Sequence, residues 1–144
     1  MATILVIDDE AEIRELMRRV LVLEGHEVDM AAHGAAALAA LAMRPYDLVI
    51  CNMRMPVMDG PTLYAHILDR DPAQAARFLF CTGDILSADV GSFLLAADRP
   101  VLMKPFTIVS LREMVRTLLN GAAPARQERK HRAEEPYAAP TWPA

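Results

Sequence analysis

The sequence alternates short apolar runs with longer segments of helical periodicity, five times within residues 1–121. The apolar runs are rich in β-branched residues and stop abruptly at polar ones, which is typical of strands buried on both faces. Such alternation predicts a parallel sheet covered by helices on both faces. The predicted fold class is therefore α/β, a doubly wound five-stranded parallel sheet in a three-layer sandwich.

The predicted strands and helices place this domain at residues 1–121. The strands are expected at Thr3–Ile7, Val28–Ala31, Asp47–Cys51, Arg77–Cys81 and Val101–Met103. The helices are expected from Ile13 to Gly25, over Ala35–Met43, from Pro61 to Asp71, over Ser87–Ala97 and from Thr107 to Asn120. Residues 122–144 carry Ala, Pro and mixed charge without periodicity, so we predict a flexible tail there.

The charge balance excludes one class of function. The chain holds 15 Lys and Arg against 19 Asp and Glu, a net charge of −4. Non-specific nucleic-acid binding needs a basic patch, so we expect no nucleic-acid partner, and the basic stretch at 126–132 is interpreted as a solvated tail.

Hydropathy and cysteine usage indicate a cytoplasmic protein without a membrane partner. No apolar stretch reaches the roughly 18 residues of a membrane span, and the N-terminus does not read as a signal peptide. Cys51 and Cys81 both lie in apolar runs, where buried free thiols are expected.

Polar residues follow the predicted strands, at the end where a doubly wound sheet binds ligands. This places Asp8, Asp9, Asn52, Thr82 and Lys104 around one crevice. Each feature by itself has an ordinary structural interpretation, because carboxylates also favour a helix start. Together they indicate chemistry: adjacent carboxylates repel unless a cation such as Mg²⁺ or Mn²⁺ joins them, while a hydroxyl and an ammonium suit phosphoryl oxygens.

Four segments make a family resemblance specific: ILVIDDE, YDLVICNMRMPVMDG, FLFCTGD and VLMKPF. Over residues 2–120 the chain resembles the CheY-like receiver domain of two-component response regulators. The resemblance implies a flavodoxin-like sheet in the order 2-1-3-4-5 and a signalling domain that is not an enzyme. It also implies a histidine kinase or phosphotransfer protein as partner in a phosphorelay.

The resemblance further implies a role for each site residue. Asp8 and Asp9 would hold Mg²⁺ with the backbone carbonyl of Arg54, and Thr82 and Lys104 would contact the phosphoryl group. The phosphoacceptor position is Asn52.

Asn52 departs from the family pattern. A neutral amide cannot attack a phosphohistidine as a carboxylate does, although its carbonyl oxygen can still face a cation with weakened affinity. Two explanations stay open. Asn52 is native in a degenerate receiver that acts as a phosphorylation-independent binding module, or a natural aspartate has been exchanged for Asn52.

The segment around Val101 departs as well, because receivers often carry Tyr or Phe there. The ending PVLMKPF resembles receivers attached to hybrid histidine kinases, and the chain would belong to an enzyme only if it were a fragment of such a kinase. By resemblance, a homodimer or a docked partner would use the 87–97 helix, the 101–103 strand and the helix after Thr107. A Mg²⁺-dependent phosphohydrolase is the weakest alternative, because the expected nucleophile is missing.

Overall fold

The computed structural model describes residues 1–121, so the predicted tail at 122–144 lies outside the described residues. The strands are β1 (Thr3–Ile7), β2 (Glu27–Ala31), β3 (Leu48–Asn52), β4 (Phe78–Thr82) and β5 (Val101–Met103). The helices are α1 (Ala11–Leu23), α2 (Gly34–Met43), α3 (Gly60–Arg70), α4 (Pro72–Ala75), α5 (Ala88–Ala97) and α6 (Ile108–Leu119). The strands form one five-stranded sheet in the order β2-β1-β3-β4-β5, which confirms the predicted topology. Among the described residues, no helix has the length and apolar character needed to span a bilayer.

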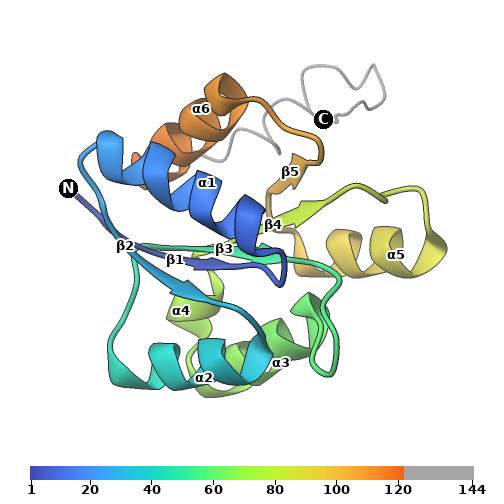
Figure 1. Cartoon of the computed structure of the whole chain (residues 1–144). Coiled ribbons are helices and arrows are strands. Elements are labelled where there is room, and N and C mark those ends of the chain that lie inside the picture. Colours follow the sequence, from blue (N-terminus) through green and yellow to red (C-terminus); the bar gives the residue numbers. More distant parts are fainter. Residues whose placement is uncertain (122–144) are drawn as a thin grey trace. The chain divides into compact units, whose positions relative to one another are not determined.

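The first compact unit, Met1–Phe78, is built around β1. β1 pairs in parallel with β2 and β3, so that Ile7 lies opposite both Ala31 and Cys51. Figure 1 shows α1 on one face of these strands and α2 and α3 on the other. Because helices cover both faces, β1 and β3 are buried almost throughout and read as continuous apolar runs rather than alternating ones.

The second unit comprises Leu79–Ala144, of which residues 79–121 are described. β4 and β5 pair in parallel, with Thr82 opposite Met103. The helices start where the sequence predicts: the Ser87 side chain accepts from the Val90 N–H at 3.3 Å before α5, and Thr107 forms a capping box with Ser110 before α6. The N-terminal ends of α5 and α6 are therefore fixed by local polar contacts.

The short helix α4 was not predicted, because Asp71-Pro72 indicates the end of α3. Asp71 both ends α3 and caps α4, since its side chain accepts from the Gln74 N–H at 3.2 Å. Pro72 fits the first turn, where no backbone N–H is needed. The α4 turn carries the buried Gln74, whose Oε1 accepts from the Tyr46 N–H at 2.8 Å and whose Nε2 donates to the Tyr46 carbonyl at 3.0 Å.

Strands β3 and β4 end one residue later than predicted, at Asn52 and Thr82. The difference arises because pairing across the sheet, not apolar composition, sets where a strand ends. Cys51 and Cys81 are both buried free thiols, as predicted.

The edge strand β2 carries a charged cluster. Arg44 Nη1 lies 3.5 Å from Glu27 Oε2, and its Nη2 lies 3.0 Å from Asp29 Oδ2. The same guanidinium lies over the Tyr46 ring, 5.2 Å from its centroid, and the Tyr46 hydroxyl donates to Asp29 Oδ2 at 2.6 Å. Burial, together with the Asp29 carboxylate, raises the pKa of Tyr46, so its hydroxyl keeps the proton that it donates.

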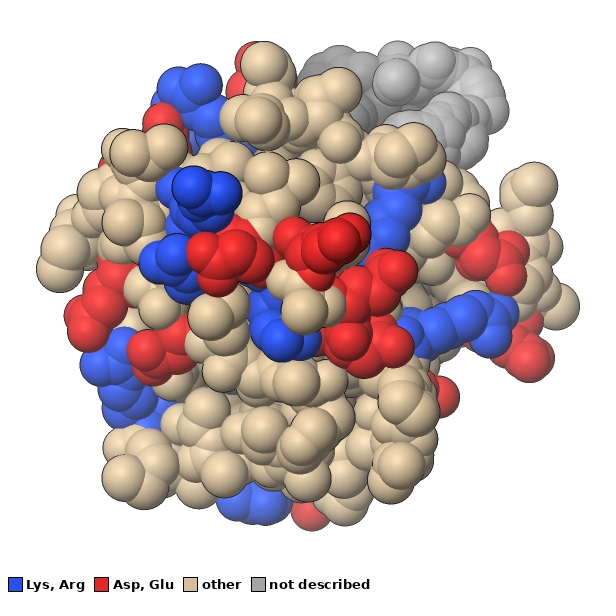
Figure 2. All heavy atoms as spheres, in the orientation of Figure 1, with Lys and Arg blue, Asp and Glu red and all other residues tan. Residues whose placement is uncertain are grey.

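Charges of both signs share the surface. Figure 2 shows Lys and Arg side chains next to Asp and Glu on the displayed face, with uncharged residues between them. Among the described residues visible there, no continuous basic patch covers that face. This mixture agrees with the small net charge of the chain.

One histidine makes the stability of the first unit depend on pH. The Ala2 N–H donates to Nδ1 of His26 at 3.1 Å, which requires that nitrogen to be unprotonated. Burial lowers the pKa of His26 below its ordinary value of 6.5, and the N-terminal ammonium lowers it further against a weaker opposing effect of Glu24. The unfolded chain therefore binds the proton first, and the free energy of unfolding should fall as the pH drops below 6.5.

The His26→Asn variant tests this expectation, because Asn keeps an acceptor for the Ala2 N–H and does not titrate. Urea unfolding at a series of pH values should give a flatter pH dependence for this variant than for the wild type. The matched change His66→Asn, at an exposed position on α3, should leave the wild-type dependence in place. Equal slopes for all three proteins would contradict the assignment to His26.

Candidate functional site

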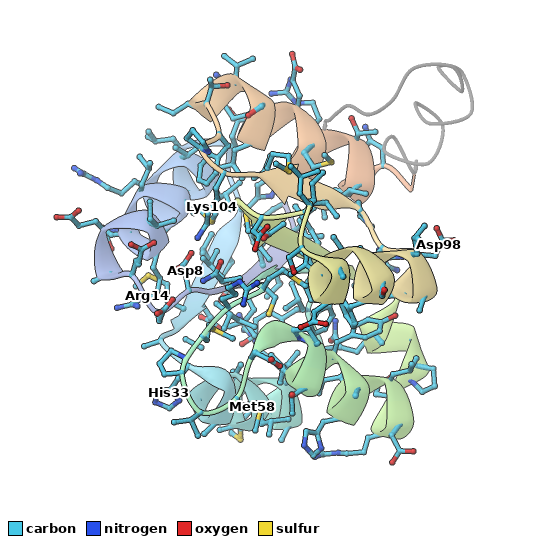
Figure 3. The ribbon with its side chains drawn as sticks, turned by 90° about the vertical axis from the view of Figure 1, so that its right-hand side faces the viewer. Asp8, Arg14, His33, Met58, Asp98 and Lys104 are labelled. Atoms are coloured by element: carbon cyan, nitrogen blue, oxygen red, sulfur yellow. The ribbon has the colours of Figure 1, made fainter. Side chains whose placement is uncertain are left out.

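The site in the first unit begins where β1 ends. Asp8 is buried, and its backbone N–H continues the pairing with β2 by donating to the Ala31 carbonyl at 3.2 Å. Its side chain contacts the turn that follows, where Oδ1 accepts from the Glu10 N–H at 2.9 Å. Arg14, in the first turn of α1, donates from Nη1 to the Asp8 carbonyl at 2.7 Å, and Figure 3 shows the two residues close together. The turn between β1 and α1 is therefore stabilised by the Asp8 side chain and by the Arg14 side chain.

Asn52 links the β1 and β3 strand ends. It is the last residue of β3 and is 8% exposed. Its Nδ2 donates to Asp9 Oδ1 at 3.1 Å and to the Arg54 carbonyl oxygen at 2.8 Å. The structure thus brings together Asp9, Asn52 and the Arg54 carbonyl, three of the residues predicted for the cation site.

The loop from Met53 to Asp59 shapes this corner of the unit. The buried side chains of Met53 and Met55 anchor the loop in the core. The Gly60 N–H donates to the Met53 carbonyl at 2.9 Å. The Asp59 side chain then caps α3 by accepting from the Thr62 N–H at 2.9 Å. The Gly60–Met53 backbone hydrogen bond and the Asp59 cap therefore restrain the loop that carries the Arg54 carbonyl.

Val57, in the middle of that loop, has an unusual backbone conformation. Its φ is +70° and its side chain is fully exposed. A β-branched residue in the left-handed region costs roughly 1–2 kcal/mol, and an exposed side chain offers no packing in return.

Replacing Val57 with glycine should therefore raise the free energy of unfolding by about 1 kcal/mol. The same change at Val109, in the first turn of α6, should lower it by about 0.5–1 kcal/mol, because glycine weakens a helix. Chemical denaturation of both variants measures the difference. Equal destabilisation by the two changes would argue against strain at Val57.

The predicted phosphoryl-contacting residues lie in the second unit. Thr82 ends β4 and is buried, and its Oγ1 accepts from the Asp84 N–H at 3.1 Å. This contact uses a lone pair of the hydroxyl, which still carries a proton to donate. Lys104 follows β5, is half-buried, and its backbone N–H donates to the Thr82 carbonyl at 2.8 Å. The backbones of Thr82 and Lys104 are thus joined at neighbouring strand ends, and the Lys104–Pro105 peptide bond is cis.

Arg14 is a site residue that the sequence analysis did not single out, because its spacing placed it on the outer face of α1. One signal was available. A basic residue in the first turn of a helix opposes the helix dipole, so its presence there indicates another contact. In the structure that contact is the Asp8 carbonyl.

The oxygen atoms of the first unit suit a hard divalent cation. Asp9 Oδ1 and the Arg54 carbonyl converge on a single point, which is shown by the one nitrogen atom that reaches both. Among the described residues, no group of three or more His, Cys, Asp or Glu side chains could hold a metal. The candidate donors are instead two neighbouring carboxylates and a backbone carbonyl, which fits Mg²⁺ with waters completing its coordination.

Comparisons with known proteins show the family to which the chain belongs. Residues 4–116 match the family model described as response regulator receiver domain. The chain is 30% identical over 122 residues to the transcriptional regulatory protein PcoR of Escherichia coli, covering 85% of this chain and 53% of PcoR. It is 33% identical over 135 residues to the response regulator protein FleR of Pseudomonas aeruginosa, covering 94% of this chain and 28% of FleR. The chain thus spans about half or less of these relatives.

Solved structures show the same fold. The chemotaxis response regulator CheY4 of Vibrio cholerae is 28% identical with a TM-score of 0.74, and the alignment covers 82% of this chain and 98% of CheY4. A CheY-like receiver domain protein from Methanospirillum hungatei is 26% identical with a TM-score of 0.76, covering 89% of this chain and 98% of that one. The family model and the strand order agree, and the chain therefore belongs to the response regulator receiver domains of two-component signalling.

Proposed function

We propose that this chain is a receiver domain that is not phosphorylated at position 52 and that acts by binding a partner protein. The observation that carries the proposal is the Asn52 side chain, whose amide nitrogen donates to Asp9 and to the Arg54 carbonyl. An amide nitrogen has its lone pair delocalised into the carbonyl, so the side chain is a hydrogen-bond donor there and not a nucleophile.

The proposed cation site consists of Asp8, Asp9, the Arg54 carbonyl and, through its carbonyl oxygen, Asn52. The convergence of Asp9 Oδ1 and the Arg54 carbonyl supports it, as does the oxygen chemistry of the set. In a phosphorylatable receiver, bound Mg²⁺ would neutralise charge on the phosphoryl oxygens. With Asn52 in place of a third carboxylate, we expect weaker Mg²⁺ binding.

Thr82 and Lys104 are the proposed phosphoryl-contacting residues. The parallel pairing of β4 with β5 supports this role, because it places the ends of these two strands at one edge and lets the Lys104 N–H donate to the Thr82 carbonyl at 2.8 Å. The Thr82 hydroxyl can donate a hydrogen bond to a phosphoryl oxygen, and the Lys104 ammonium can pair with its charge.

The proposed partners are a histidine kinase or a phosphotransfer protein, because the relatives of this chain are response regulators. The proposed contact surface is α5, β5 and α6, the elements that the resemblance assigns to dimerisation and docking. Large apolar side chains exposed on these helices support it: Leu95 is 85% exposed and Val109 is 57% exposed. A receiver domain of a hybrid histidine kinase would have the same site residues. We also propose a cytoplasmic location.

A small phosphodonor such as acetyl phosphate tests the proposal. With Mg²⁺ present, intact-mass spectrometry should find no phosphoryl group on the wild-type chain and one on the Asn52→Asp variant. The matched Asn120→Asp variant adds the same charge at an exposed helix end and should behave as the wild type. Labelling of the wild type at position 52, or no labelling of Asn52→Asp, would refute the proposed site.

A further inference from the structure

Both N–H groups of the Asn52 amide point at atoms that can only accept hydrogen bonds. One contacts a carboxylate oxygen of Asp9 at 3.1 Å, and the other contacts the Arg54 carbonyl oxygen at 2.8 Å. Turning the amide over would place its own carbonyl oxygen against two other oxygens. The nitrogen is therefore the end of the amide that faces these two oxygens.

The same two oxygens belong to the proposed cation site. A cation and an amide nitrogen cannot both lie between Asp9 Oδ1 and the Arg54 carbonyl, because they would occupy the same space and the cation would repel the N–H dipoles. We propose that the Asn52 amide occupies the place of the divalent cation, so that the pocket is satisfied by an internal donor and Mg²⁺ must displace it. This inference rests on the cation site of the proposed function.

The inference changes what Asn52 does to cation binding. The usual expectation is that Asn weakens binding because a negative charge is missing. Here Asn52 also competes, because its two hydrogen bonds must break before the cation binds. Asn52 can then contribute only by rotating about its Cβ–Cγ bond to present the carbonyl oxygen. The amide orientation therefore reports whether a cation is bound.

The two asparagines of the chain make this measurable by nuclear magnetic resonance. Selective ¹⁵N-asparagine labelling gives signals from Asn52 and Asn120 alone, and Asn120 is an exposed internal control. Without cation, the Asn52 amide protons should exchange with water at least tenfold more slowly than those of Asn120, because both are hydrogen-bonded and Asn52 is buried. Addition of Mg²⁺ should shift the Asn52 signals and leave those of Asn120 in place. Equal exchange rates for the two residues would overturn the inference.

Mg²⁺ affinities of variants separate competition from the loss of charge. The Asn52→Ala variant removes the donor without adding charge and should bind Mg²⁺ about 2- to 10-fold more tightly than the wild type, because no hydrogen bonds must break. Asn52→Asp should bind roughly tenfold or more tightly, because it adds a carboxylate ligand. Asn120→Asp should equal the wild type. Isothermal titration with MgCl₂ gives these values, and circular dichroism checks that each variant is folded.

The outcomes distinguish the two proposals. Weaker Mg²⁺ binding by Asn52→Ala than by the wild type would overturn the competition, while phosphoryl transfer to Asn52→Asp would still support the proposed function. Tighter binding by Asn52→Ala without phosphoryl transfer to Asn52→Asp would support the competition and refute the proposed phosphoacceptor site. No Mg²⁺ binding by any variant would overturn the competition, whatever the exchange rates.

Discussion

Replacing Gly60 with alanine is expected to lower the free energy of unfolding by about 2–4 kcal/mol. A Cβ at position 60 would lie 2.7 Å from the Asn52 carbonyl oxygen and 3.1 Å from the Met53 Cα. Both are backbone atoms at the end of β3, so neither can move aside as a flexible side chain would. The added methyl group must instead displace the loop that places Arg54, and urea denaturation monitored by circular dichroism measures the loss.

The matched control is Gly91→Ala, inside α5. There the nearest atom to a new Cβ is the Ile85 carbonyl oxygen at 3.5 Å, an ordinary contact. Because alanine is a better helix former than glycine, this variant should gain about 0.5–1 kcal/mol. Similar stability of the two variants would show that the close approach at Gly60 does not constrain the chain.

Gln74→Met is expected to lower the free energy of unfolding by about 2–5 kcal/mol. The side chain of Gln74 is 6% exposed and pairs with both the N–H and the carbonyl of Tyr46. Methionine has nearly the same length and fills the same space, but it satisfies neither group. Each buried backbone group left without a partner costs about 1–3 kcal/mol, so the loss comes from hydrogen bonding rather than from a cavity.

Gln74→Glu supplies the control for this prediction. Its ionised carboxylate keeps the acceptor for the Tyr46 N–H but cannot donate to the Tyr46 carbonyl, whereas its protonated form can. Burial should raise the pKa of the new carboxyl, so the folded protein takes up the proton first and the deficit relative to wild type should shrink as the pH falls. A Gln74→Met protein as stable as the wild type would contradict the proposed pairing.

The sequence predicted most of the fold because local signals and the sheet agree. Thr107 caps α6 as expected, Ser87 lies at the start of α5 where that helix was expected to begin, and β5 covers the predicted residues. The short helix α4 was not predicted, because Asp71-Pro72 can mark the end of one helix or the start of another. The C-terminal ends of β3 and β4 were predicted one residue too early, because the composition of a single strand does not show how far it pairs with its neighbours.

The sequence predicted that Asp9 and Asn52 lie near one another at the strand ends of the first unit, but not the contacts that they make. Strand ends identified Asp9 and Asn52 as neighbours, because parallel strands end at one edge of a sheet. The direction of the Asn52 amide and the contact of Arg14 with the Asp8 carbonyl depend on side-chain rotamers, which spacing does not determine. The left-handed backbone at Val57 could not be expected, because valine rarely adopts it.

The charged cluster on β2 has a consequence for self-association. An edge strand exposes unpaired backbone groups to which a strand of another molecule can add, and such addition leads to aggregates. β2 is one edge of the sheet, and it carries Glu27 and Asp29 with the Arg44 side chain laid across them. An approaching strand would have to remove these charges from water. The charges on β2 therefore disfavour the addition of a strand from another molecule along this edge. The other edge strand, β5, has only three residues with which such a strand could pair.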